Sequence, residues 1–288
     1  MVLKSYSKVN LFLRILNRRR DNFHNIETIF ERIDLCDGIV LMPRKDDLIR
    51  IICKDPSVPA DKTNLCYRSA DLLRKSCRVN KGVDITIRKN IPVGAGLGGG
   101  SGNAATVLLG LNKLWRLGLS RKKLAQLGAR IGSDIAFFVY EAPFALGRGR
   151  GEKIKPISSL SNTRFWHILA VPKIHVSTPL IYRKYDQYSG LTASESSVKI
   201  LLPALVKKDL PLVSEGIFNS LEAITIRLYP EVRRVKKTLA DSGLKSILMS
   251  GSGPAVFAIA SSKKEAVLLR NRLAKKYRSW RIFAVRTR

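Results

Sequence analysis

The stretch Pro92-Val-Gly-Ala-Gly-Leu-Gly-Gly-Gly-Ser-Gly-Asn-Ala-Ala, residues 92–105, decides the fold. It follows an alternating apolar run at 83–87 that predicts a strand, and it leads into a helix predicted from Gly102 or Asn103 to about residue 116. The glycines remove side chains where the backbone must approach another group closely. Because a helix N-terminus offers unpaired N–H groups and a positive dipole end, this arrangement predicts a phosphate cradle. The hydroxyl of Ser101 is suited to a phosphate oxygen or a magnesium ion.

The loop does not fit the better-known phosphate-binding motifs. Gly94, Gly96 and Gly99 satisfy the dinucleotide pattern G-x-G-x-x-G, but that pattern requires an acidic residue about 20 positions further on to hold a ribose. Residues 85–133 contain no Asp or Glu. The G-x-x-x-x-G-K-[ST] sequence of P-loop proteins is absent, as are the H-R-D and D-F-G motifs of protein kinases. The loop therefore predicts a phosphate site of another family.

The acid-free stretch ends at Asp134, in Gly132-Ser-Asp-Ile-Ala-Phe-Phe. An anionic ligand near the loop would meet little repulsion, since basic side chains are the charged groups of this stretch. A lone carboxylate among small residues is suited to act as the general base for a hydroxyl group. The same position is equally suited to the N-cap of the helix that follows. The local sequence leaves both interpretations open.

The remaining patterns predict an α+β protein. Residues 8–16 alternate as a strand whose second face, with Lys8 and Asn10, is too mixed for ordinary core. Further strands are predicted at 38–42, 48–52, 166–171, 246–249, 255–260 and 281–285. Helices are predicted at 63–74, 197–207, 230–242 and 263–277, and one capped by Ser120 carries Leu124, Leu127 and Ile131. A boundary near 150–165 predicts two domains, 1–155 and 156–288.

Composition narrows the class of protein. Of 288 residues 45% are hydrophobic, which argues against disorder, and no apolar run reaches the roughly 18 residues of a membrane span. Lys4, Lys8 and Arg14 interrupt any signal-peptide core, so we expect a cytoplasmic protein without membrane contact. The 52 Lys and Arg exceed the 22 Asp and Glu by 30. This excess attracts nucleic acid, anionic lipid or phosphorylated metabolites alike, and a basic proteome background would give the same number.

The cysteines do not predict a metal site. Cys36, Cys53, Cys66 and Cys77 form no C-x-x-C pair, and only three histidines accompany them. A zinc site would need an irregular ligand set. We expect free, mostly buried thiols and no metal held by the protein alone.

Three separated motifs resemble those of the GHMP kinases, the family of galactokinase, homoserine kinase and mevalonate kinase. Residues 92–101 are similar to the P-x-G-x-G-L-G-S/G-S/G-S signature, and Gly-Ser-Asp at 132–134 is similar to the segment with the family's aspartate. Leu-Met-Ser-Gly-Ser-Gly-Pro-Ala-Val-Phe at 248–257 resembles the C-terminal glycine motif. The resemblance covers essentially the whole chain. It implies a ribosomal-protein-like N-terminal domain and a ferredoxin-like C-terminal domain.

The N-terminal motifs select one branch of that family. Ser-Lys-Val-Asn-Leu-Phe-Leu at 7–13 and Arg-Asp-Asn-Phe-His-Asn-Ile-Glu-Thr at 20–28 resemble A-K-L-N-L-x-L and D-G-Y-H-x-L-x-T. This branch transfers a phosphoryl group from ATP, with ATP-bound Mg2+, to the 2-hydroxyl of CDP-methylerythritol in the non-mevalonate isoprenoid route. The alternatives are a kinase of a small alcohol such as homoserine or mevalonate, and a basic RNA-binding protein suggested by the charge of residues 263–288. We expect a monomer or homodimer and no nucleic-acid partner.

The resemblance implies a role for each matching residue. Asp134 would deprotonate the acceptor hydroxyl, and Lys8 would hold that base ionised and offset developing charge. Phe23 and Tyr182 would stack on cytosine from opposite faces, and His24 would hydrogen-bond to it. Asn10 and Thr178 match further substrate-lining positions, and Asn64 and Lys89 match other positions in the substrate or nucleotide site. The ATP phosphates would contact Pro92, Val93, Gly94, Ala95, Gly96, Leu97, Gly98, Gly99, Gly100, Ser101 and Gly102.

The chain departs from the family pattern at three places. Asn22-Phe23 replaces the usual Gly-Tyr, which keeps the ring and loses its hydroxyl. Gly102 replaces a serine of the loop, and Ala136 stands where a proline often follows the aspartate. None of these changes removes a catalytic group, so we expect them to affect the positioning of the substrate.

Overall fold

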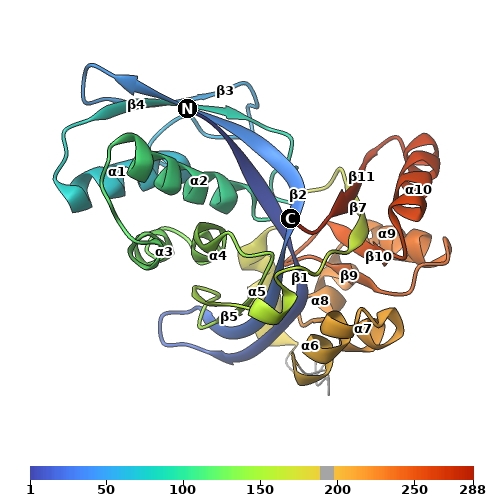
Figure 1. Ribbon diagram of the computed structural model, residues 1–288. Helices are drawn as coiled ribbons and strands as arrows, with labels where there is room; N and C mark the ends of the chain where they lie inside the picture. Colours follow the sequence, from blue (N-terminus) through green and yellow to red (C-terminus); the bar gives the residue numbers. More distant parts are fainter. Residues whose placement is uncertain (189–197) are drawn as a thin grey trace.

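Two long N-terminal strands form the centre of the protein. In the computed structural model, which describes residues 1–188 and 198–288, β1 (Val2–Arg18) and β2 (His24–Arg44) pair antiparallel along most of their length. Figure 1 shows this curved pair between helices α1–α4 on one side and the C-terminal sheet on the other. Every other part of the site is built against these two strands.

The first sheet has the strand order β3-β4-β2-β1-β8, and β5 pairs with both β2 and β6. Its further strands are β3 (Ile49–Cys53), β4 (Gly82–Arg88), β5 (Phe144–Arg148), β6 (Lys153–Pro156) and β8 (Phe218–Asn219). The helices α1 (Leu65–Cys77), α2 (Gly99–Leu114), α3 (Arg121–Ala129) and α4 (Ile135–Tyr140) share one buried apolar cluster with it. Strand β8 comes from the second half of the chain, so the first sheet contains segments from both halves.

The second sheet has the order β11-β7-β10-β9. Its strands are β7 (Trp166–Pro172), β9 (Ile247–Met249), β10 (Val256–Ala260) and β11 (Trp280–Arg286), and a buried cluster joins it to α9 (Pro230–Ala240) and α10 (Lys263–Lys276). The connecting helices are η1 (Ser158–Leu160), α5 (Thr178–Gln187), α6 (Val198–Lys207), α7 (Leu210–Gly216) and α8 (Glu222–Leu228).

A buried polar cluster connects the two sheets. The Oε1 atom of Glu31 on β2 lies 2.8 Å from Nε2 of His167 on β7 and accepts a hydrogen bond of 2.5 Å from the hydroxyl of Thr287. All three side chains are buried. Hydrogen bonding offsets part of the cost of burying these groups, and the bond from Thr287 ties the C-terminal residues to β2.

The α+β class is confirmed, and most predicted elements lie within a few residues of those observed. The prediction was wrong for β2, which was expected only at 38–42, because its acidic residues break the apolar alternation. Helix α2 begins at Gly99, ahead of the predicted start, while Ser120 caps α3 as expected by accepting a bond of 3.2 Å from the amide of Lys123. Ile131 falls after that helix, and Ser197 lies outside the described residues. The elements η1, α5, α7, α8, β5, β6 and β8 had not been predicted.

The four cysteines are free, but only Cys66 is fully buried, which corrects the expectation of mostly buried thiols. Burial raises the pKa of the Cys66 thiol to about 12, so this thiol stays protonated at neutral pH. Within residues 1–188 and 198–288, no helix is both long and apolar enough to span a bilayer.

Candidate active site

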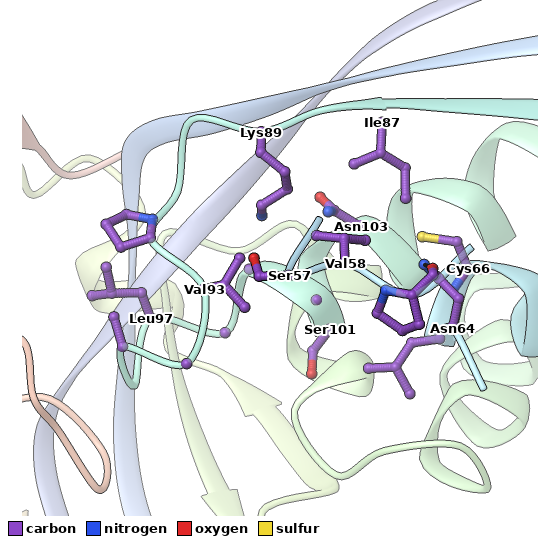
Figure 2. A pocket seen from close by; sticks show the side chains of 18 of the residues that line it. Ser57, Val58, Asn64, Cys66, Ile87, Lys89, Val93, Leu97, Ser101 and Asn103 are labelled. Atoms are coloured by element: carbon purple, nitrogen blue, oxygen red, sulfur yellow. Dashed lines mark hydrogen bonds between the residues drawn. The ribbon is translucent and has the colours of Figure 1, made fainter. Parts of the chain in front are cut away.

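The glycine-rich loop borders a cavity of about 500 Å3, here called the loop cavity. The N-terminus of α2 opens onto it, with Gly98 as the residue that precedes the helix. Figure 2 shows Lys89, Asn64, Asn103 and Ser101 around this space. The lining includes Pro92, Val93, Gly94, Ala95, Gly96, Leu97, Gly98, Gly99, Gly100, Ser101 and Thr178. Ten of the eleven loop positions singled out in the sequence therefore face one cavity.

Gly102 is the exception among those positions. It is buried in the first turn of α2, where an added Cβ would lie 2.6 Å from the carbonyl oxygen of Tyr6. The absence of a side chain lets α2 approach β1 closely, so the contribution of Gly102 is to packing.

The strands β1 and β2 each hold part of the glycine-rich loop in place. Its entrance is fixed by Asp37 of β2, whose Oδ1 accepts bonds of 2.7 and 2.8 Å from the amides of Asn90 and Ile91. The other oxygen of Asp37 pairs with the ammonium of Lys89, which projects toward the cavity. The carbonyl of Leu97 accepts from the amide of Lys8 at 3.0 Å.

The C-terminal glycine motif closes against the middle of the loop. The hydroxyl of Ser250 donates to the carbonyl of Gly96 at 3.0 Å. The backbone N–H of Ala255 donates to the carbonyl of Ala95 at 3.3 Å. Gly96 has a φ of +76°, and a Cβ there would overlap the carbonyl oxygen of Ser250. The conformation and the close approach both require glycine at this position.

A second cavity of about 790 Å3, here called the Asp134 cavity, adjoins the first. Gly96, Gly98, Ser101 and Thr178 line both cavities, so the two spaces meet beside the loop. Lys8, Asn10, Phe23, His24, Asp134 and Tyr182 also line the second cavity. The structure thus gathers the catalytic and substrate-binding residues predicted from the sequence around one space.

Lys8 and Asp134 form an ion pair at the inner end of this cavity. Their Nζ and Oδ2 atoms are 3.5 Å apart, and the lysine side chain is only 4% exposed, compared with 28% for the aspartate. Lys8 also donates to Oδ1 of Asn10 at 2.6 Å and to the carbonyl of Gly96 at 3.0 Å. Burial lowers the pKa of Lys8, while the nearby carboxylate of Asp134 opposes that shift.

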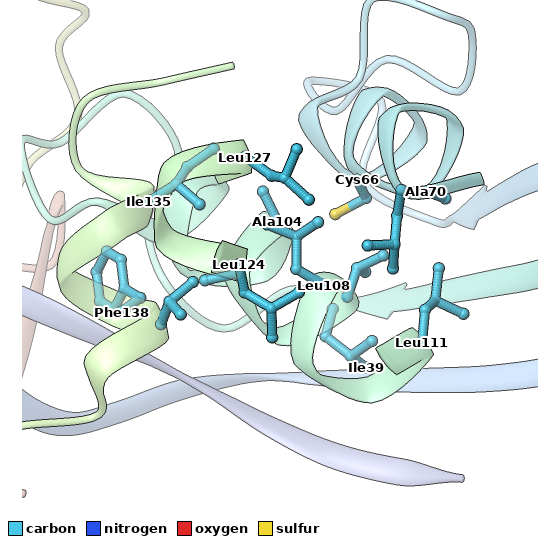
Figure 3. Packing of buried hydrophobic residues seen from close by; sticks show 14 of the residues in the cluster. Ile39, Cys66, Ala70, Ala104, Leu108, Leu111, Leu124, Leu127, Ile135 and Phe138 are labelled. Atoms are coloured by element: carbon cyan, nitrogen blue, oxygen red, sulfur yellow. The ribbon is translucent and has the colours of Figure 1, made fainter. Parts of the chain in front are cut away.

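The start of α4 places Asp134 beside Lys8. Figure 3 shows Ile135 and Phe138 of α4 packed with Leu124 and Leu127 of α3 in the cluster around α2. This packing anchors the helix that follows the aspartate. Asp134 has helical backbone angles and makes no capping hydrogen bond with its side chain. Of the two interpretations that the sequence left open, the structure does not support the N-cap.

The far end of the cavity carries the aromatic residues. The rings of His24 and Tyr182 are 5.2 Å apart and tilted by 33°, whereas Phe23 lies at the rim with 56% of its surface exposed. The guanidinium of Arg150 lies 5.0 Å from the centre of the Phe23 ring. Burial is the main cause that raises the pKa of Tyr182, with the charge of Asp134 adding to it, so the hydroxyl stays protonated.

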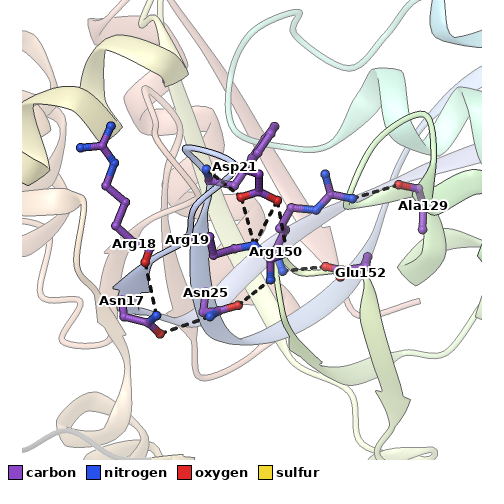
Figure 4. A network of polar contacts seen from close by, with 9 residues as sticks. Asn17, Arg18, Arg19, Asp21, Asn25, Ala129, Arg150 and Glu152 are labelled. Atoms are coloured by element: carbon purple, nitrogen blue, oxygen red, sulfur yellow. Dashed lines mark hydrogen bonds and ion pairs between the residues drawn. The ribbon is translucent and has the colours of Figure 1, made fainter.

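A polar network holds the turn between β1 and β2. Arg19 donates to Asp21 at 3.1 Å and to Asn25 at 3.0 Å, and Asp21 accepts from the amide of Phe23 at 3.2 Å. Figure 4 shows Arg19, Asp21 and Asn25 beside Arg150, whose guanidinium donates to the carbonyl of Ala129 at 3.4 Å. The network sets the position from which Phe23 and His24 enter the cavity.

Sequence reasoning missed five charged residues that line the Asp134 cavity: Arg18, Asp21, Arg150, Arg183 and Asp186. Asp186 had a detectable signal, because it follows Tyr182 by four residues and therefore lies on the same face of a helix. The helix itself had not been predicted, so this spacing carried no weight. Arg150 approaches from the β5–β6 turn, which no pattern in the sequence connected with Phe23.

Comparison with known proteins identifies the family. Residues 64–142 match the family model of the GHMP kinases N terminal domain, and residues 201–279 match that of the GHMP kinases C terminal. A 4-diphosphocytidyl-2-C-methyl-D-erythritol kinase of Geobacillus sp. (strain WCH70) is 43% identical over 90% of this chain and 88% of its own. The enzyme of that name from Shouchella clausii (strain KSM-K16) is 43% identical over 94% and 89%.

A solved structure agrees with these relatives. The crystal structure of a 4-(cytidine 5'-diphospho)-2C-methyl-D-erythritol kinase superposes with a TM-score of 0.83 at 32% identity, covering 99% of this chain and 98% of the other. High coverage in both directions means that the two chains share the same overall fold along nearly their whole length. The chain therefore belongs to the GHMP kinase family and, within that family, to the 4-diphosphocytidyl-2-C-methyl-D-erythritol kinases.

Proposed function

We propose that this protein transfers the γ-phosphoryl group of ATP to the 2-hydroxyl of 4-diphosphocytidyl-2-C-methyl-D-erythritol, with Asp134 as the general base. The junction of the two cavities is the observation that carries the proposal. A cavity at a helix N-terminus is suited to the phosphates of ATP, and it opens beside the Lys8–Asp134 pair into a larger cavity with aromatic walls. Donor and acceptor can therefore meet at the aspartate.

The proposed step needs few covalent events. Asp134 takes the proton of the acceptor hydroxyl, whose oxygen forms a bond to the γ-phosphorus as the bond to the β–γ bridging oxygen breaks and ADP leaves. The transition state is loose, so positioning and charge stabilisation contribute most of the catalysis. The amides at the start of α2 are suited to hold the donor phosphates in this position.

Lys8 is suited to offset negative charge during the transfer. Its ammonium is buried, points into the cavity and is held by neutral oxygens of Asn10 and Gly96 as well as by Asp134. A buried cation with one counter-charge interacts strongly with a further anion, because solvent screens it little. The same ammonium lies 3.5 Å from the carboxylate of Asp134, which accepts the proton in the proposed step.

The site is also compatible with Mg2+ bound to ATP. Mg2+ keeps most of its water and phosphate ligands and takes few oxygens from the protein. The hydroxyl of Ser101 and the carboxylate of Asp134 are oxygen donors that line the cavities. In the part of the chain that the structure describes, no three His, Cys, Asp or Glu side chains cluster to hold an ion. These residues fit an ion that arrives with ATP, where it would neutralise phosphate charge.

An assay of ADP release with ATP and magnesium tests the proposal. The protein is offered 4-diphosphocytidyl-2-C-methyl-D-erythritol, homoserine and mevalonate in parallel. We expect turnover on the cytidylyl substrate alone. Turnover on a small alcohol alone would keep the kinase and discard the cytidine pocket, and no turnover on any of the three would contradict the proposal.

Phe23→Ala tests the stacking of cytosine on the rim of the cavity. The exposed ring of Phe23 is suited to a base, and base–aromatic stacking contributes about 1–3 kcal/mol. We expect the KM for the cytidylyl substrate to rise about 10- to 100-fold while kcat and the KM for ATP change little. Phe23→Tyr keeps the ring and serves as the matched control. An unchanged KM in the alanine variant would refute the stacking role.

Three further expectations belong to this proposal. The domains 1–155 and 156–288 are supported by β6, which ends at Pro156, and by β7, which begins the second sheet at Trp166. A cytoplasmic location is consistent with the use of ATP as donor. A monomer or homodimer remains the expected assembly, because each chain contributes both cavities by itself.

A further inference from the structure

One face of α5 forms a wall of the Asp134 cavity. Thr178, Tyr182 and Asp186 are spaced four residues apart along this helix, so their side chains lie on the same face, and all three line the cavity. The hydroxyl of Thr178 is 2.6 Å from that of Ser252, in the C-terminal glycine motif. The family resemblance implies substrate-binding roles for Thr178 and Tyr182, whereas it implies none for the charged residue of the series, Asp186.

Asp186 makes its shortest contact with His24. Its Oδ1 lies 2.6 Å from Nε2 of the imidazole, and its Oδ2 lies 3.7 Å from Nε of Arg18. The imidazole is almost fully buried, with Tyr182 against its face and the ring of Tyr185 edge-on at 6.3 Å. The ring is therefore held from three directions.

The carboxylate decides where the imidazole carries its proton. An ionised carboxylate only accepts hydrogen bonds, and the guanidinium of Arg18, 3.7 Å from Oδ2, is a positively charged partner for it. Nε2 of His24 must then be the donor in the 2.6 Å contact. A neutral imidazole has a single N–H, so Nδ1 is left as an acceptor.

We propose that Asp186 sets the base specificity of the site by fixing this tautomer of His24. The inference rests on the proposed function and on the role that the family resemblance implies for His24, a hydrogen bond to the base of the substrate. An acceptor at Nδ1 pairs with the 4-amino group of cytosine. Uracil has a carbonyl oxygen at that position, so two acceptors would face each other, which is unfavourable in a buried site. Asp186 is thus a positioning residue that acts through His24.

Asp186→Asn reverses the arrangement with almost no change in volume. Arg18 offers only donors, so the amide oxygen turns toward Arg18 and the amide nitrogen toward His24. Nε2 must then accept, the proton moves to Nδ1, and the ring offers a donor to the base. The variant is expected to lose preference for cytosine and to gain tolerance for uracil.

The first test compares CDP with UDP as ligands at about pH 8, where an ordinary imidazole is neutral. We expect the unmodified protein to bind CDP more tightly, and the ratio of the two Kd values to fall about 10- to 100-fold in Asp186→Asn, as for the loss of one buried hydrogen bond. Asp241→Asn removes the same charge from the exposed end of α9 and should leave the ratio unchanged. An unchanged ratio in Asp186→Asn would overturn the proposal.

The second test observes the tautomer itself. The chain has only three histidines, so 15N–1H correlation spectra of the imidazoles can be assigned with a His24→Gln variant. We expect His24 to be protonated at Nε2 in the unmodified protein and at Nδ1 in Asp186→Asn. A His24 that is protonated at Nδ1 in the unmodified protein would contradict the inference. A merely structural role of Asp186 would not move the proton from one nitrogen to the other.

Neither test requires turnover, so the two hypotheses can fail separately. Tight CDP binding with the predicted tautomer but no phosphoryl transfer would reject the proposed function and keep the role of Asp186. Phosphoryl transfer to the cytidylyl substrate with an unchanged base preference in Asp186→Asn would keep the function and reject that role.

Discussion

Asp134→Ala is expected to lower kcat about 10²- to 10⁴-fold, the usual effect of losing a general base, and to leave both KM values nearly unchanged. The carboxylate lies at the inner end of the acceptor space, 3.5 Å from Lys8, and makes no capping bond that would give it a structural role in α4. Its removal also takes away the charge that holds up the pKa of Lys8, so burial would lower that pKa further. Proton acceptance and charge stabilisation would weaken together.

The control for this variant is Glu141→Ala. Glu141 is an exposed carboxylate at the opposite end of α4 that pairs with Arg121 at 2.6 Å. Neither partner lines the Asp134 cavity, so kcat should stay close to that of the unmodified protein. Steady-state assays of ADP release measure kcat for both variants, and thermal unfolding checks that both are folded. An Asp134→Ala enzyme with nearly normal kcat would remove Asp134 from the mechanism.

Gly96→Ala is expected to lower the free energy of unfolding by about 2–5 kcal/mol and to raise the KM for ATP. A φ of +76° costs an alanine about 1–2 kcal/mol, and overpacking against the carbonyl of Ser250 adds about 1–3 kcal/mol. The backbone of Ser250 and Gly253 blocks the added methyl group, so the loop or the C-terminal glycine motif must shift. Either movement changes the wall that the two cavities share.

Gly118→Ala separates these two causes. Gly118 has a similar φ of +67°, but an added Cβ would meet nothing within 4 Å. It should therefore lose only about 1–2 kcal/mol, the cost of the backbone conformation. Urea unfolding of both variants measures the difference, which reports the close approach alone. Equal losses in the two variants would mean that the loop yields without strain.

The sequence predicted the loop, the aspartate and the fold class because each depends on local chemistry. A run of glycines between a strand and an apolar helix has few structural uses, and periodic apolar residues predicted α9, α10 and all four strands of the second sheet. Such patterns are strongest where one face of an element is buried and the other is exposed.

The same reasoning failed where tertiary contacts override local pattern. Glu31 and Asp37 appear unsuited to a buried strand, yet their bonds to His167, Thr287 and the loop entrance make burial acceptable. Helix α5 was missed, and Asp186 was missed with it. The partner of Asp186, His24, is 162 positions away, and no single-sequence pattern connects them.

The contact between Ser250 and the loop has a consequence for how the enzyme is made. The backbone N–H of Asn10, at the start of the chain, donates to the hydroxyl of Ser250, 240 positions later, and that hydroxyl in turn donates to the carbonyl of Gly96. A chain leaving the ribosome exposes its N-terminal strands long before this serine is synthesised. The glycine-rich loop gains its contact with Ser250 only after part of the last fifth of the polypeptide has been synthesised. An unfinished chain therefore lacks the support that shapes its nucleotide site.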